Sequence, residues 1–581
     1  MEPGERLLKA AVTITVVSIV SKFLGLAREA SLAGIFGATG FVDAYLVGET
    51  IPNLFITSVG SAVGTIFIPV FSQVRRERGI GSAFDMANSV INAAVLVGLI
   101  LVTAGEVSTG FLIRLAAPGF QGPIFDLAVD MARIMFPMAV FQTLSGLLTG
   151  MLQAIGEFTV PVLASAAVNV VLIISIVTFG PRYGIVAVAV GTVIAFATQV
   201  VLHLPALYRA GYRWRPVLNL RDPWLRRVAI LTIPTLVATG AAQLNGFVER
   251  SLASRLPEGS MAALNYAYRL MALVPGVLGL AIVTVVYPAL AAMAADRDWA
   301  RFSTGFVRAV NMINFVLVPV AVGMAVLRVP LVRFVFERGA FDSEATQATA
   351  WALLFYSLGG GVLAIREMIT RAFFALQETT VPTVINIISV AVNIVLNFAL
   401  VGPLLHAGLA LSASLSGLFG AVALLLILRP RIRAIVGNET IAVTNSMSNL
   451  AKPTSEPEQY AVAGPPVGAS RGLWFVRNRI TYGADSRNRV AFSWKAILVP
   501  LWRILVASSA MGSTMWLVNS VMEVELPGDS IALQGVRLLS SVGMGVTSYA
   551  LVSKVLRIGE LKLVEDAALR AWHKVSRVQR T

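Results

Sequence analysis

The residues of this 581-residue chain that could do chemistry are charged side chains inside apolar segments. They are Lys22, Arg28, Glu29, Asp43, Glu49, Glu249, Arg250, Arg269, Arg366, Glu367 and Arg371. An ionisable group inside a bilayer is costly, so it usually faces a cavity or a partner of opposite charge. Guanidinium groups can bind phosphate bidentately, so arginines around one cavity would suit a phosphate-bearing substrate.

Lys22, Arg28 and Arg269 are the sharpest candidates for a cationic cavity. Local pairing is the alternative where an acid is adjacent in sequence, as for Arg28 beside Glu29, although adjacent residues of a helix do not face each other. The same alternative holds for Arg250 beside Glu249 and for Arg366 beside Glu367. Arg269 has no acid among its sequence neighbours, which favours the cavity.

The sequence carries no convincing signature of an enzyme. There is no Gly-x-x-x-x-Gly-Lys-Ser/Thr loop, so ATP is not an obvious energy source. The three histidines (His203, His406 and His573) make no metal-binding spacing, and cysteine is absent. No acid–base pair and no nucleophile with a base is visible, so we expect a non-enzymatic protein without cofactor or metal.

Composition indicates the elements that must position these charges. The chain is 56% hydrophobic and 13% charged, with a mean hydropathy of +0.78, whereas soluble proteins carry about 25% charged residues. Its apolar stretches are about 20 residues long, which is the length that spans a bilayer. We therefore expect an all-α polytopic membrane protein with about 14 transmembrane helices. The predicted spans are 8–27, 41–72, 86–107, 127–153, 158–179, 184–207, 227–253, 262–292, 305–327, 346–376, 382–402, 407–429, 500–521 and 533–556.

An internal repeat organises these spans into two halves. Ala154, Glu157, Thr159, Val160 and Pro161 recur at an offset of 221 as Ala375, Glu378, Thr380, Val381 and Pro382. A repeat of this kind in an apolar chain predicts two similar membrane lobes with the substrate bound between them near the midplane.

The repeat and the composition together divide the chain into five parts. We expect an amino-terminal six-helix lobe over 1–220 and a carboxy-terminal six-helix lobe over 221–433. Residues 434–499 are rich in Pro, Ser, Asn and Gly and are expected to be a disordered cytoplasmic linker. Two more helices follow in 500–558, and a cytoplasmic tail fills 559–581.

Basic residues orient the chain in the membrane. The net charge is +15, and the arginine clusters fall on alternate loops, so the positive-inside rule places both termini in the cytoplasm. Loop arginines facing anionic lipid explain this charge, and we expect no nucleic-acid partner. The exception is Arg328, Arg333 and Arg338 on the outer side, where nearby acids predict a partly paired interfacial segment.

Several motifs resemble the MurJ (MviN) lipid II flippase family. They are the run 21–29 (Ser-Lys-Phe-Leu-Gly-Leu-Ala-Arg-Glu), Phe36-Gly37-Ala38, Asp43-Ala44, Ile51-Pro52-Asn53-Leu54, the run 264–271 (Leu-Asn-Tyr-Ala-Tyr-Arg-Leu-Met), the run 336–341 (Phe-Glu-Arg-Gly-Ala-Phe), and 366–382. The last two are the most specific, and the resemblance covers about 1–430 and 500–556.

The resemblance implies a fold of the multidrug/oligosaccharidyl-lipid/polysaccharide (MOP) exporter superfamily. It implies two six-helix lobes and a groove for a polyprenyl tail at 500–558. It further implies that the chain moves lipid II, or a related polyprenyl-pyrophosphate glycolipid, from the inner to the outer leaflet by alternating access during cell wall synthesis. The expected setting is the bacterial inner membrane, with membrane lipids as partners and the chain as a monomer.

The resemblance also assigns roles to residues. Arg28 and Arg269 take the basic cavity roles, and Lys22 stands where the family usually has Arg. Asp43 matches a family acid, and we class it with Glu29, Glu249, Arg366 and Arg371 as further cavity or gating residues. Asn393 and Asn397 fall where some members hold sodium, but Asn397 replaces an acid, so sodium or proton coupling stays open.

The amino-terminal half departs from the family pattern. Phe55-Ile56-Thr57 stands in place of an arginine pair, and Tyr268 stands where Asp is usual before Arg269. Two alternatives therefore remain beside lipid II: a flippase for another polyprenyl-linked oligosaccharide, or a drug exporter of the multidrug and toxin extrusion (MATE) type. An alternative of another class is a non-transporting scaffold that recruits envelope enzymes through 437–495.

Overall fold

The chain folds into a bundle of long helices. The computed structural model describes residues 3–219, 221–450, 493–528, 530–563 and 565–566, and these contain helices, turns and loops but no strand. Ten helices in this part are long and apolar enough to cross a membrane. The expectation of an all-α polytopic membrane protein is therefore confirmed, whereas the count of 14 spans is not.

The first half of the chain forms helices that are connected by short turns. These are α1 (Pro3–Phe36), α2 (Gly40–Ala116), α3 (Gly122–Met135), α4 (Met138–Ala154), α5 (Thr159–Ile174), η1 (Ser175–Phe179), α6 (Gly180–Tyr183) and α7 (Ile185–Arg209). Pro137 separates α3 from α4, since a proline lacks the backbone N–H that would continue the helix.

The second half repeats this arrangement and adds two helices. These are α8 (Pro223–Ala253), α9 (Ser260–Val274), η2 (Pro275–Gly279), α10 (Leu280–Ala295), α11 (Trp299–Val326), α12 (Arg328–Phe336), α13 (Ser343–Ala375), α14 (Thr380–Leu404), α15 (His406–Leu450), α17 (Lys495–Glu525) and α18 (Ile531–Val555). The predicted linker begins at 434, but α15 continues to Leu450, and residues 451–492 lie outside the described part. The predicted tail is described only for 559–563 and 565–566.

The element α2 holds two of the predicted spans. The helix is interrupted at Gly79, whose φ of 82° and ψ of 172° reverse the chain direction between the spans 41–72 and 86–107. A residue with a Cβ is strained at such a φ, so glycine is the natural residue for this turn. The turn places Arg75, Arg76 and Arg78 at one end of the bundle.

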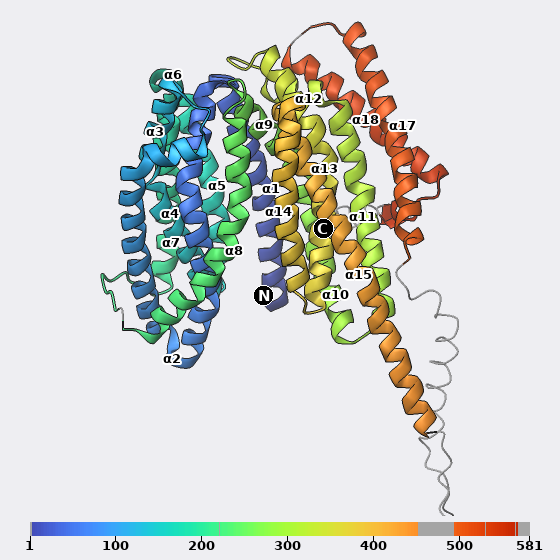
Figure 1. Cartoon of the computed structure of the whole chain (residues 1–581), viewed down its shortest axis with the longest axis horizontal. Helices are drawn as coiled ribbons and strands as arrows, with labels where there is room; N and C mark the ends of the chain where they lie inside the picture. Colours follow the sequence, from blue (N-terminus) through green and yellow to red (C-terminus); the bar gives the residue numbers. More distant parts are fainter. Residues whose placement is uncertain (1–2, 220, 451–492, 529, 564, 567–581) are drawn as a thin grey trace, which may run out of the picture.

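The helices form two groups that lie side by side (Figure 1). In one group α2 packs on α3 and α4, and α7 packs on α4 and α5; in the other, α13 packs on α9, α11 and α15. The helices α1 and α8 touch both groups, because α1 contacts α5 and α9 while α8 contacts α2 and α14. Packing across these two helices, together with a direct contact of α2 with α9, therefore joins the two groups.

The last two helices form a separate layer. They pack on each other and on α11 and α12, around an apolar cluster that includes Phe315, Met511 and Tyr549. The Tyr549 hydroxyl donates to the Phe315 carbonyl at 2.8 Å, which fixes α18 against α11. Figure 1 shows this layer on the outer flank of the second group.

The internal repeat is visible in the backbone. Glu157 N donates to Leu152 O at 2.8 Å, and 221 residues later Glu378 N donates to Phe373 O at 3.0 Å. The residue before each of these glutamates has a positive φ, which is 93° at Gly156 and 58° at Gln377. A second pair, Gly184 and Leu405, shows the same correspondence at φ of 67° and 52°. The repeated sequence therefore specifies the same turns twice.

This pair of turns gives a matched test of stability. We expect Gly156→Ala to lower the free energy of unfolding by about 1 kcal/mol, because a Cβ in the left-handed region is strained. We expect Gln377→Gly to leave it unchanged or raise it slightly, because that strain is relieved. Thermal unfolding of the purified protein would measure both, and a loss of stability in Gln377→Gly equal to that in Gly156→Ala would contradict the assignment.

Candidate functional site

A buried carboxylate joins the two groups of helices. Glu29, on α1, is 3% exposed, and its Oε1 lies 2.5 Å from Arg28 Nη2 and 3.4 Å from Arg269 Nε. Its other oxygen, Oε2, accepts a hydrogen bond from Asn265 Nδ2 at 3.0 Å. One carboxylate therefore serves two guanidinium groups and an amide.

The positions of these partners follow from helix geometry. Asn265 and Arg269 are four residues apart on α9, so they lie on one face of that helix. Arg28 is the neighbour of Glu29 on α1, and its Nη1 donates to Asn169 Oδ1 on α5 at 3.3 Å. The ion pair between Glu29 and Arg269 thus crosses from the first half of the chain to the second.

A small pocket opens beside this cluster. It is lined by Arg28, Glu29, Leu32, Tyr45, Leu46, Glu49, Leu172, Ile176, Val188 and Arg269. Tyr45 shares a hydrogen bond with Thr192 at 3.1 Å, which holds its ring in place. The Arg269 side chain remains 49% exposed, so part of its guanidinium is free to meet a ligand.

Lys22 faces the second half of the chain but does not join the cluster. Its side chain is exposed, and its Nζ lies 2.9 Å from where a Cβ on Gly276 would be placed, in η2. Two of the three predicted cavity residues, Arg28 and Arg269, therefore share one carboxylate, while Lys22 lies along the same seam.

Asp43 closes the seam at one end. Its Oδ2 accepts from Gly259 N at 2.7 Å and its Oδ1 from Ala262 N at 2.8 Å, at the start of α9. A carboxylate is favoured at this position because the first amides of a helix lack partners and carry partial positive charge. Asp43 lies on α2, so this cap joins the halves instead of capping its own helix.

Backbone contacts surround Asp43 and make this the closed end of the bundle. The Tyr266 hydroxyl donates to Gly37 O at 3.1 Å, and Ala340 N donates to Gly34 O at 2.9 Å. Gly259 has φ of 84°, and a Cβ there would lie 2.1 Å from Ala38 O. The backbone segments around Gly259 and Ala38 approach each other too closely for any residue except glycine at position 259.

The other predicted cavity or gating residues lie away from the cluster. Glu249 accepts from the Tyr356 hydroxyl at 3.3 Å. Arg366 donates to Asn386 Oδ1 at 2.5 Å. Arg371 pairs with Glu367 at 2.9 Å and lies over the Tyr287 ring, so local pairing accounts for its charge. A cavity role for Glu249, Arg366 and Arg371 stays a prediction.

The predicted ion site contains two buried amides. Asn393 Nδ2 donates to Ser416 Oγ at 3.1 Å, and Asn397 Nδ2 donates to Asn393 Oδ1 at 3.0 Å. Asn397 Oδ1 is buried and has no hydrogen-bond partner among the described residues. The described residues hold no cluster of His, Cys, Asp and Glu suited to a metal. Ion binding at Asn393 and Asn397 stays a prediction.

The three arginines predicted to lie on the outer side make local contacts. Arg333 pairs with Glu337 at 3.2 Å, Arg328 donates to Ala325 O, and Arg338 donates to the carbonyls of Phe334 and Val335. Arg328 and Arg333 lie on α12, a short segment between α11 and α13, and Arg338 follows its end. These contacts explain how three arginines are accommodated away from the other basic clusters.

Sequence reasoning missed the uncharged partners of the cluster. Asn265, Asn169 and Tyr45 contact the charged groups or line the pocket, but their residue types alone do not mark them. Glu29 was among the predicted cavity or gating residues, but its pairing with Arg269 was missed, because Glu29 lies on α1 and 240 residues away in the sequence. Only the spacing of Asn265, one turn before Arg269, offered a local signal.

Two repeated helical halves with a charged seam define a membrane transport fold. The chain matches the family model of "Lipid II flippase MurJ" over residues 32–455. It is 29% identical over 434 residues to the lipid II flippase MurJ of Burkholderia cenocepacia, covering 73% of this chain and 84% of the relative. It is 30% identical over 431 residues to a probable lipid II flippase MurJ of Rhizobium meliloti, covering 72% and 80%.

Solved structures show the same fold. A lipid II flippase MurJ in an inward closed conformation matches with a TM-score of 0.70 at 21% identity, covering 94% of this chain and 98% of that one. An inward-facing MATE transporter of the MOP superfamily matches with a TM-score of 0.63 at 15% identity, covering 73% and 99%.

The chain belongs to the MurJ lipid II flippase family. The predicted family is thereby confirmed. The family consists of transporters and not of enzymes, as expected from the sequence.

Asp43 provides a test of the closed end. Asp43→Ala leaves two buried amides without an acceptor, and we expect the free energy of unfolding to fall by about 2 kcal/mol. Asp43→Asn keeps one acceptor oxygen, so a smaller loss is expected. Thermal unfolding of the purified protein would measure both variants. Asp126→Ala, which removes an exposed acid on α3, is the control, and an equal loss there would contradict the role of Asp43.

Proposed function

We propose that this chain moves lipid II from the inner to the outer leaflet of the bacterial inner membrane by alternating access, for cell wall synthesis. Family membership supports the substrate, and the cluster of Arg28, Glu29 and Arg269 between the halves supports the mechanism. Lipid II carries a pyrophosphate between its sugars and its polyprenyl tail. Two guanidinium groups that share one carboxylate suit the capture of that anion.

The cluster couples binding to movement. A pyrophosphate that enters the seam competes with Glu29 for Arg28 and Arg269. When Arg269 turns to the ligand, the ion pair between α1 and α9 is lost and the halves are released from each other at this point. A buried ion pair is strongly destabilised if one partner leaves without replacement, so the ligand's charge compensates the arginines as the pair opens.

The closed end acts as the second gate. Release of the headgroup on the far side requires the caps of Asp43 on α9 and the contacts around Gly37 to separate. The pocket beside the cluster is far too small for a disaccharide–peptide headgroup, which is in keeping with a closed arrangement around the cluster. A ligand shifts such an equilibrium only by binding one state more tightly.

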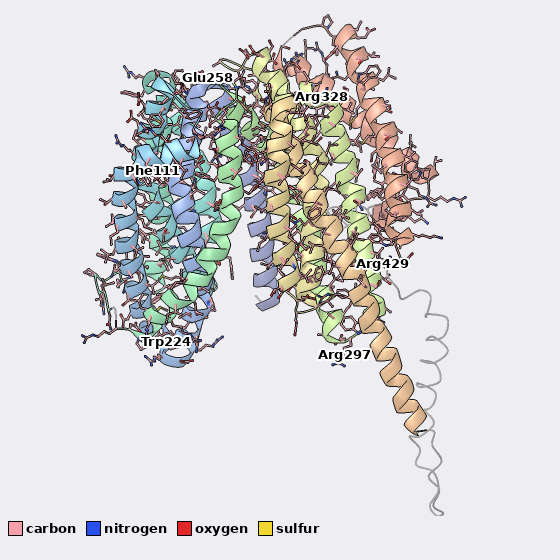
Figure 2. All side chains as sticks on the ribbon, viewed as in Figure 1. Phe111, Trp224, Glu258, Arg297, Arg328 and Arg429 are labelled. Carbon is pink, nitrogen blue, oxygen red and sulfur yellow. The ribbon has the colours of Figure 1, made fainter. Side chains whose placement is uncertain are left out.

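Charge at the two ends supports an orientation. Figure 2 shows Trp224, Arg297 and Arg429 toward the end opposite to Glu258 and Arg328. The same basic end contains Arg75, Arg76 and Arg78, which precede the Gly79 turn within α2. Arg78 lies over the Trp224 ring. The positive-inside rule then puts this basic end in the cytoplasm together with both termini, and puts the closed end outside.

The remaining parts of the proposal concern the tail, the driving force and the assembly. The layer of α17 and α18 offers apolar surface for a polyprenyl chain, and we propose that the chain works as a monomer among membrane lipids. Cations in the seam respond to the membrane potential, and sodium at Asn393 and Asn397 or a proton are the other candidate driving forces.

A second function is favoured by one observation. The likeness to a MATE transporter extends over 73% of this chain, so a drug exporter or a flippase for another polyprenyl-linked oligosaccharide would use the same fold. The growth and transport test with lipid II described below distinguishes these functions.

Arg269 is the sharpest position for testing transport. In a strain depleted of its lipid II flippase, we expect the wild-type chain to restore growth and Arg269→Ala to fail at equal expression. Arg269→Lys keeps the charge but loses the planar fork, so partial function is expected. In proteoliposomes, transport of headgroup-labelled lipid II should fall by roughly 10- to 100-fold in Arg269→Ala, the loss expected for hydrogen bonds to a charged group.

Arg301→Ala is the matched control, because Arg301 is an exposed arginine at the basic end paired with Asp298. If the wild type does not restore growth while another charged glycan depends on the chain, the lipid II assignment is wrong.

Deletion of the linker separates a transporter from a scaffold. We expect a chain lacking residues 451–492 to keep most of its growth rescue and its transport in proteoliposomes. A scaffold that recruits envelope enzymes through this segment would lose rescue, although its membrane part would still be present. Immunoblotting of the membrane fraction would exclude loss of expression as the cause.

A further inference from the structure

The loop between α7 and α8 carries a second concentration of positive charge, remote from the Glu29 cluster. Six arginines and one aspartate lie between residues 209 and 227. Residues 210–219, here called the basic loop, also expose Trp214, Val217 and Leu218, which are 55%, 49% and 40% exposed. Exposed apolar side chains beside arginines have no function in the transport mechanism proposed above.

The basic loop is held in a defined shape by two asparagines of α2. Asn92 Nδ2 donates to Arg215 O and Val217 O, each at 2.8 Å, and Asn88 Nδ2 donates to Arg213 O at 3.1 Å. The buried Tyr212 hydroxyl donates to Asn88 Oδ1 at 2.7 Å. The backbone is therefore fixed against the helix, and its exposed side chains are presented from a fixed frame.

The tryptophan of the loop is anchored by its polar edge. Trp214 Nε1 donates to Asn92 Oδ1 at 3.0 Å, so the indole N–H is satisfied by the protein while the ring stays exposed. An amphipathic ring held in this way suits the interface between lipid headgroups and acyl chains, where tryptophan is enriched.

The loop runs along the flank of α2 toward the centre of the bundle. Asn88 and Asn92 follow the Gly79 turn by 9 and 13 residues, so at 1.5 Å per residue they lie roughly 14–20 Å from it along the helix axis. Figure 1 shows the loop beside α2 at the basic end. The span predicted from the sequence in this part of α2 begins at residue 86, so we expect the loop to lie near the membrane surface and the Gly79 turn to lie beyond it.

The acids near the loop do not cancel its charge. Asp85 lies 3.7 Å from Arg215, in a pair whose two side chains are both mostly exposed. Asp222 is engaged as the cap of α8, where its Oδ1 accepts from Trp224 N at 2.9 Å. Among the described residues, Arg213 donates to the backbone carbonyls of Tyr208 and Tyr212 and lies over the Tyr208 ring, and no acid pairs with it.

A second aromatic marks the end of this surface. The Trp224 ring lies between two guanidinium groups, with Arg78 at 5.8 Å and Arg227 at 5.6 Å from the ring centroid. The attraction between each guanidinium group and the aromatic ring holds both arginines beside Trp224. The positive surface therefore extends from the basic loop to the Gly79 turn.

We propose that the basic loop binds anionic phospholipid headgroups of the leaflet on its own side of the membrane. Arg213 and Arg215 meet the phosphates, and Trp214, Val217 and Leu218 enter the interface. A bilayer fits this surface better than a soluble polyanion, because the loop lies on the flank of a membrane-spanning helix and because apolar side chains accompany its charges. The loop connects the two halves of the chain, so its attachment to the leaflet holds the connection at a fixed depth.

The absence of cysteine allows a direct test with a single probe. Val217→Cys would be spin-labelled in the full-length chain and reconstituted in vesicles of phosphatidylcholine alone or of phosphatidylcholine with phosphatidylglycerol at three to one. We expect the label to become accessible to oxygen and shielded from a water-soluble nickel chelate in the phosphatidylglycerol vesicles. Arg213→Gln with Arg215→Gln should shift the docking equilibrium back by roughly 30-fold, as expected for two arginines at an anionic surface.

The control removes equal charge from the other half of the chain. Arg297→Gln with Arg301→Gln changes the loop between α10 and α11, and the label at 217 should then dock as in the parent. The proposal is overturned if the label stays in water in both vesicles, or if the two double variants weaken docking equally. The proposal is also overturned if the label is shielded from the nickel chelate only after soluble polyglutamate is added. That result would favour a soluble acidic partner.

Discussion

The Glu29 carboxylate is the interaction on which the arrangement of the two halves depends. It is buried, and the groups that compensate its charge come from both halves: Arg28 from α1 itself, and Asn265 and Arg269 from α9. A buried charge must be paired or it destabilises the fold, so the closed seam persists only while these partners stay in place. The same requirement makes the seam responsive to an anionic ligand, because only another negative charge can take over the arginines.

Asp43 completes this arrangement by a different means. Its partners are backbone amides of α9 and not basic side chains, so it holds the closed end through the unsatisfied donors of a helix terminus. Close backbone approaches at Gly37 and Gly259 surround it, and these tolerate little displacement. The seam therefore has a charged, ligand-sensitive region in the middle and a tightly packed closure at one end, which suits alternate opening of the two sides.

The repeat explains why one chain can build such a seam. The turns at Gly156 and Gln377 show the same hydrogen bonds, and those at Gly184 and Leu405 the same positive φ, so both halves follow one backbone plan. The copies differ in their side chains. The first supplies the carboxylates Glu29 and Asp43, whereas the second supplies Arg269 and the amides of α9 that receive them. Because like halves carry unlike charges, their interface is complementary.

The sequence alone determined the class of fold, the family and the charged residues inside the predicted spans. Apolar length and an internal repeat are local or periodic signals, so they can be recognised without coordinates. It did not reveal that Arg269 pairs with Glu29, that Asp43 caps α9, or that asparagines complete the cluster. These contacts join residues 141 to 240 positions apart, and only the packing of α1 against α5 and α9 and of α2 against α9 brings them together. The sequence also separated the spans 41–72 and 86–107 on either side of the Gly79 turn, whereas the break at Pro137 lies inside the predicted span 127–153.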